Sequence, residues 1–161
     1  MRFKTYSMRY SLQVVLEHKN DVVRNIEISS NKSLEDLHYA IIDSLNLNKQ
    51  EIASFYMTNK KFELLNEIPL FKIDESEKET IVMSEIKIKS IFTNIDTQLL
   101  YIYDFIKMWR FLISFSNKSD TKSETTEVSR SIGEMPKEAP QIIFTSHKNN
   151  DNFDQFNEPE Y

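Results

Sequence analysis

The stretch Tyr-Ser-Met-Arg-Tyr-Ser-Leu-Gln-Val-Val-Leu at residues 6–16 decides the fold of this chain. Its even positions are all apolar or aromatic, and its odd positions are polar except for Val15. A period of two predicts a β-strand with one buried face. After the polar run 18–21 the same pattern resumes over residues 22–28, so the two stretches predict an N-terminal antiparallel hairpin.

The next segment predicts the main helix, at residues 33–45. Ser33 is a good N-cap, and Asp36 stands three places later, where an acid completes a capping box. Asn46 and Asn48 provide the stop. The helix has one apolar stripe, formed by Leu34, Leu37, Ile41 and Leu45.

Further strands are expected downstream of the helix. Residues 53–58 predict one strand, whereas Pro69 makes residues 68–73 either an edge strand or an irregular crossing segment. Residues 99–105 and 110–115 predict a second hairpin beside the first. Between these stretches, Ile88, Ile91 and Phe92 have the spacing of a short helix, and the acidic run 74–79 is typical of a solvated loop or, less often, of an acidic contact patch.

The chain is expected to divide into one core domain and a tail. Residues 1–116 form the core, and residues 117–131 are too polar to bury much surface, which predicts a linker or a mobile loop. Residues 132–144 form an extended segment that docks on the core, where residues 142–144 could add a last strand. The acidic tail at residues 145–161 is expected to be disordered.

Composition excludes several classes of function. The 161 residues include no Cys and one Gly, which removes disulfides, thiolate metal sites and glycine-rich phosphate loops. Lys and Arg number 20 against 25 Asp and Glu, a net charge of −5, so direct nucleic-acid binding is not expected. Without a signal-peptide pattern or a membrane-spanning run, we expect a cytoplasmic protein away from membranes.

Two motifs resemble a known family. The helix carries Leu-His-Tyr-Ala-Ile at residues 37–41, and a later strand carries Tyr-Ile-Tyr-Asp-Phe at residues 101–105 followed by Trp109. This pairing resembles the plasmid pRi ORF-three-like family, also known as TnpR passenger proteins of insertion elements. The resemblance implies an α+β fold, similar to a β-grasp, in which a mixed sheet of two hairpins packs on one main helix. It implies no activity.

One departure from the family pattern limits what can be transferred. Where the family has Gly-Asp-Asp before the Trp, this chain has Ile106-Lys107-Met108. A metal or catalytic role of the family's acids therefore does not carry over to these positions. We expect no metal site and no cofactor.

Five residues are candidates for a binding site: His38, Tyr101, Tyr103, Asp104 and Trp109. His38 could act as a base or ligand, but a histidine beside an apolar helix stripe more often orients the helix. A buried Asp104 needs a partner, and His38 is the partner we expect. The alternating aromatic residues could line a groove, although cross-strand packing is more common.

The sequence favours a small, non-enzymatic binding or adaptor domain that engages a protein partner through a sheet edge or its C-terminal segment. Two alternatives stay open. One is an accessory protein of a mobile genetic element that acts near DNA through a partner. The other is an enzyme that uses His38 with Asp104.

Overall fold

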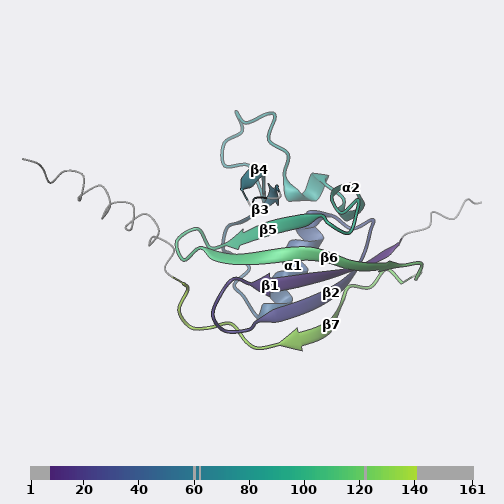
Figure 1. Ribbon diagram of the computed structural model, residues 1–161. Coiled ribbons are helices and arrows are strands. Elements are labelled where there is room, and N and C mark those ends of the chain that lie inside the picture. Colours follow the sequence, from purple (N-terminus) through teal and green to yellow (C-terminus); the bar gives the residue numbers. More distant parts are fainter. Residues whose placement is uncertain (1–7, 60, 62, 122, 141–161) are drawn as a thin grey trace, which may run out of the picture.

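The computed structural model describes residues 8–59, 61, 63–121 and 123–140. Its main feature is a seven-stranded sheet of order β4-β3-β5-β6-β1-β2-β7, with one long helix, α1, against one face (Figure 1). No helix in these residues combines the length and the apolar composition that a membrane crossing requires.

The elements follow one another along the chain as β1 (Arg9–Leu16), β2 (Val23–Ser29), α1 (Leu34–Leu45), β3 (Ala53–Thr58), β4 (Leu64–Pro69), the 3-10 turn η1 (Met83–Glu85), α2 (Ile88–Ile91), β5 (Gln98–Tyr103), β6 (Trp109–Ser119) and β7 (Glu127–Ile132). The predicted N-terminal hairpin is β1–β2, and the second predicted hairpin is β5–β6.

The core lies between α1 and the sheet. Alternate residues of the central strands face the helix and are buried, as the period of two requires. The largest fully buried side chains include Leu12, Ile26, Phe55, Tyr101 and Phe111. From α1, the buried apolar residues are Leu34, Leu37, Ile41, Ile42 and Leu45.

The capping signals of α1 are confirmed. The Ser33 hydroxyl accepts a hydrogen bond from Asp36 N at 3.1 Å, and the Asp36 carboxylate accepts one from Ser33 N at 2.9 Å. At the other end Asn46 is the C-cap, with a φ of 58° in the left-handed region that asparagine tolerates. Both ends of the helix could therefore be predicted from single residues.

The expected fold class was wrong. In place of a β-grasp-like mixed sheet of two hairpins on a main helix, the structure has a sheet-dominated fold of seven strands. Every strand pairing among the described residues is antiparallel. A mixed sheet needs a parallel pair, and the period of two predicts strands without predicting their relative direction.

The two edge strands explain why the sheet is larger than predicted. In β4, Ile68 alone is buried, and β7 has no buried residue. Such strands are held mainly by main-chain hydrogen bonds to a neighbour, which leave no hydrophobic pattern. The stretch 117–131, expected to be a linker, accordingly contains the end of β6 and most of β7. Residues 142–144 and the tail 145–161 lie outside the described residues.

A buried arginine joins the last edge strand to the helix. Arg24 on β2 is 6% exposed, and its Nε donates to the Ser44 carbonyl near the end of α1 at 3.0 Å. Its two other nitrogens donate to Ile132 O, at the end of β7, at 2.9 Å and to Gly133 O, just beyond the strand, at 2.8 Å. One side chain thus links the end of α1 to the end of β7.

Gly133 occupies a position that excludes a side chain. Its φ is +71°, and a Cβ added there would lie 2.0 Å from the Asp21 carbonyl oxygen in the β1–β2 turn. Both the backbone conformation of Gly133 and its close approach to the main chain of Asp21 require glycine.

We therefore expect Gly133→Ala to lower the free energy of unfolding by about 2 kcal/mol or more. Urea unfolding of the full chain measures the change. Ser131→Ala, at an exposed position of β7 two residues before Gly133, serves as the control and should stay within about 0.5 kcal/mol of wild type. A Gly133→Ala protein as stable as the control would contradict the close approach.

Candidate functional site

His38 has a partner that the sequence did not predict. The side chain is fully buried on α1, and its Nδ1 lies 2.7 Å from the Tyr101 hydroxyl on β5. Burial lowers the pKa of His38 from its ordinary value of 6.5 to about 4, so the imidazole is neutral at pH 7. Burial also raises the pKa of Tyr101 well above its usual range. The pair therefore joins helix to sheet as two neutral groups.

Asp104 does not contact His38 through a hydrogen bond, so the expected pairing was wrong. Its Oδ1 accepts hydrogen bonds from Ile106 N at 3.0 Å and Lys107 N at 3.2 Å, and its carbonyl accepts one from Met108 N. The carboxylate thus organises the β5–β6 turn. Asp104 adopts a φ of 65°, a conformation that aspartate tolerates because its side chain can bond to the local main chain.

The remaining sequence-predicted residues are buried in the sheet. Tyr103 and Trp109 face each other in the β5–β6 register, and the Tyr103 hydroxyl donates to Asn48 O at 2.8 Å. Arg110, the residue after Trp109, donates through its Nε to Glu17 Oε2 at 2.8 Å. None of the five predicted site residues lines the groove at the β4 end of the sheet. Their role in binding stays a prediction.

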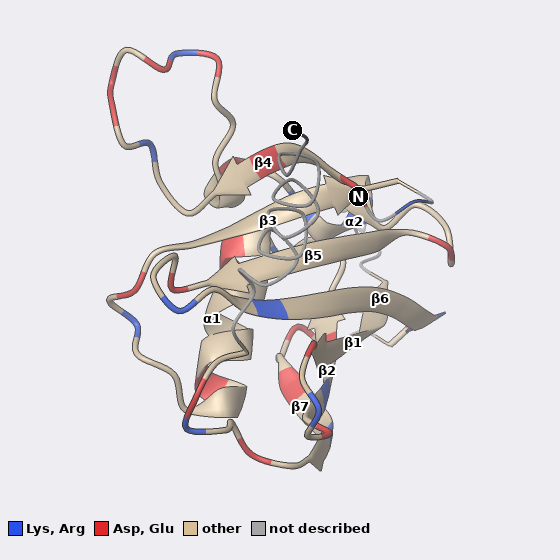
Figure 2. Cartoon of the chain, turned by 60° about the vertical axis from the view of Figure 1, so that its left-hand side comes forward, with Lys and Arg blue, Asp and Glu red and all other residues tan. Residues whose placement is uncertain are grey.

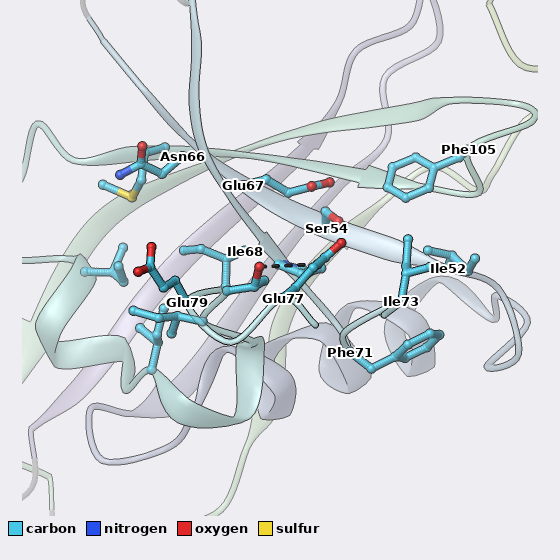
Figure 3. Close-up of a pocket in the computed structure, with 16 residues that line it drawn as sticks. Ile52, Ser54, Asn66, Glu67, Ile68, Phe71, Ile73, Glu77, Glu79 and Phe105 are labelled. Carbon is cyan, nitrogen blue, oxygen red and sulfur yellow. Dashed lines mark hydrogen bonds between the residues drawn. The ribbon is translucent and has the colours of Figure 1, made fainter. Parts of the chain in front are cut away.

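A hollow among the described residues lies elsewhere, at the β4 end of the sheet. A groove of about 640 Å³ runs between strands β3 and β4 and the segment 70–82 (Figure 3). Ile52, Phe71, Ile73 and Phe105 gather at one end of it, and all four are exposed. This size is typical of sites that bury a small ligand or a few side chains of a partner.

Acidic side chains border the same groove. Glu67 comes from β4, and Glu77 and Glu79 come from the segment 70–82, whose acidic residues stand out in Figure 2. This segment is held by its own hydrogen bonds: Glu77 N donates to Asp74 O at 3.0 Å, and Thr80 N donates to Glu77 O at 3.3 Å. The main-chain N–H of Ser76 donates to the Asp74 carboxylate and lowers its pKa.

Two hydroxyl groups, of Tyr56 and Ser54, lie close to Glu67 of the groove lining. The Tyr56 hydroxyl donates to Glu67 Oε2 at 2.7 Å, which fixes the carboxylate at the rim. Burial and the Glu67 carboxylate raise the pKa of Tyr56, against a smaller opposite effect of the nearby Ser54 hydroxyl. Ser54 is fully buried and lines the groove, and its hydroxyl faces that of Tyr56.

No strand among the described residues pairs with the outer side of β4. β4 stands at the end of the sheet and pairs with β3. Leu70 N, just beyond the strand, donates to Ala53 O at 3.2 Å. Because alternate residues of an antiparallel strand point their main-chain groups to opposite sides, Glu67 N–H and the carbonyls of Glu67 and Pro69 point away from β3. Pro69 has no N–H to offer there, which suits an edge strand.

Comparison with known proteins places the chain in a family. Residues 8–143 match the family model described as plasmid pRiA4b ORF-3-like protein. The chain belongs to this family. The resemblance that rested on residues 37–41 and 101–105 is thereby confirmed, and the structure shows that these two motifs meet through His38 and Tyr101. A comparison with curated proteins gave no match.

A solved structure shows the same fold. A protein of unknown function from Methanosarcina mazei Go1 superposes with a TM-score of 0.69 at 18% sequence identity, over 98% of this chain and 85% of that one. At this identity the likeness establishes the fold alone. In the chain described here, no group of three or more His, Asp and Glu among the described residues is placed to hold a metal ion.

Sequence reasoning missed the groove, although one signal pointed to it. Phe71 and Ile73 are large apolar residues directly before the acidic run 74–79, outside any periodic stretch. Apolar residues in a charged loop have no core of their own to enter. The sequence shows these two residues before the acidic run. Only the fold shows that they lie beside Ile52 and Phe105, which come from two other parts of the chain.

The lowered pKa of His38 predicts a pH-dependent stability. Between pH 6.5 and 4 the unfolded chain protonates His38 and the folded chain does not, so protonation favours unfolding as the pH falls. We expect wild type to lose about 2 kcal/mol more than His38→Gln between pH 7 and pH 4.5, measured by urea unfolding. Tyr101→Phe keeps the titrating imidazole and should retain the wild-type slope. Parallel profiles for wild type and His38→Gln would refute the assignment.

Proposed function

We propose that this protein is a protein-binding domain that receives an extended segment of a partner along β4. The observation that carries the proposal is an open strand edge beside a groove rich in exposed apolar side chains. Such an edge can accept a strand from another chain, because main-chain hydrogen bonds supply affinity and side-chain pockets supply specificity.

The distribution of exposed apolar side chains supports this surface over the opposite sheet edge. Eleven large apolar residues are exposed in the described part of the chain. Five of them belong to β4 and the following segment: Leu64, Leu65, Phe71, Ile73 and Ile81. On β7, the other edge, Val128 is the single member of this set. Three of these five, Phe71, Ile73 and Ile81, line the groove, and exposed apolar side chains gathered at one place are typical of an interaction site.

The buried polar groups do not support the enzymatic alternative. An enzyme that uses His38 with Asp104 needs both side chains in one cleft. His38 bonds to Tyr101 inside the core, and Asp104 bonds to its own turn. The proposal therefore rests on the surface of the β4 edge.

Strand addition at β4 can be tested on the main chain directly. Peptides selected from a random display library on the full chain supply the probes, and their affinities are measured by fluorescence polarisation. Glu67→Pro removes the outward N–H without removing a hydrogen bond to β3, whereas Glu67→Gln keeps that N–H and removes the same charge. We expect Glu67→Pro to bind about fivefold more weakly than Glu67→Gln, the effect of one hydrogen bond.

A second readout locates the bound peptides. Hydrogen exchange of the Glu67 amide should slow on binding, while that of Val128 on the opposite edge should not. A failure to select any peptide, or equal affinities of the two Glu67 variants with no protection at Glu67, would overturn the proposal.

A further inference from the structure

The groove beside β4 carries charge of a single sign. Of the described residues that line it, the charged ones are Glu67, Glu77 and Glu79, with no Lys or Arg among them. Glu67 lies on β4, and Glu77 and Glu79 lie in the segment that follows this strand. Clefts lined by one sign of charge attract groups of the opposite sign and disfavour like charge.

Most of the remaining lining is apolar. Phe71, Ile73, Ile81 and Phe105 are exposed on its walls. A free metal ion or a small hydrophilic cation would leave these side chains in water. A ligand that combines positive charge with apolar groups would cover them and also meet the carboxylates.

We propose that the groove binds an extended peptide segment of the partner in which Lys or Arg side chains are interspersed with apolar ones. This inference rests on the proposed function, since strand addition at β4 brings the segment to the groove. The cationic groups pair with Glu67, Glu77 and Glu79, and the apolar side chains cover Phe71 and Ile73. Tyr56 holds the Glu67 carboxylate in place for this pairing.

A pair of matched peptides tests the charge preference. Both have about eight residues, blocked ends and the same Val, Ile and Phe positions, and they differ in that one carries Lys where the other carries Glu. We expect the basic peptide to bind the full chain at least about tenfold more tightly than the acidic one, with an affinity that falls as salt rises from about 0.05 to 0.5 M.

A double variant locates the effect in the groove. Glu77→Gln with Glu79→Gln should weaken the basic peptide about fivefold or more, without changing the melting temperature. The control is Glu134→Gln with Glu138→Gln, which removes the same charge from exposed positions outside the groove lining and should bind like wild type. Equal weakening by both double variants would indicate a general charge effect and overturn the inference.

The outcomes separate this inference from the function on which it rests. Library peptides that require the Glu67 N–H but carry no excess of Lys or Arg would refute the charge preference and leave strand addition standing. Failure of the library peptides and of the matched pair would refute both. Preference for the basic peptide, abolished in the Glu77 and Glu79 double variant alone, would support both.

Discussion

The pairing of β1 with β6 is the constraint on which the rest of the structure depends. It joins residues 9–16 to residues 111–119, about 100 positions apart in the chain. On one side of this pair lie β2 and β7, and on the other lie β5, β3 and β4. The groove is built on the last of these strands, in the half of the sheet that the β1–β6 pairing joins to the N-terminal hairpin. Local propensity alone cannot produce such a sheet, because its central hydrogen bonds close the longest loop.

The elements that could be predicted from sequence are those whose own residues encode them. The alternation in β1 and β2, and the Ser33 cap and Asn46 stop of α1, each reflect a local physical rule. Strand direction, by contrast, depends on which strands meet, and β4 and β7 have too few buried residues to show a pattern. This is why the expected mixed sheet was wrong while most of its strands were correctly located.

The candidate site shows the same division. Sequence reasoning selected polar and aromatic residues within apolar stretches, and the structure gives His38 and Asp104 bonds that organise the fold. The residues of the groove are mostly apolar residues in loops and at strand ends, where such residues are common. They form a groove only because the fold brings them together. Ile52 follows α1, Phe71 follows β4 and Phe105 lies in the β5–β6 turn. No local pattern relates three such positions.

Pro69 and the three glutamates of the groove also oppose self-association of the protein. An open strand edge is a hazard, because two copies of a protein can pair there and begin to aggregate. Edge-to-edge contact between two copies at β4 would bring Glu67, Glu77 and Glu79 of both together, and Pro69 would offer no N–H to the neighbour. Repulsion among these carboxylates disfavours that contact. The same charges that would attract a basic strand thus disfavour pairing between two copies of the protein. The edge of β4 can therefore stay unpaired without promoting aggregation.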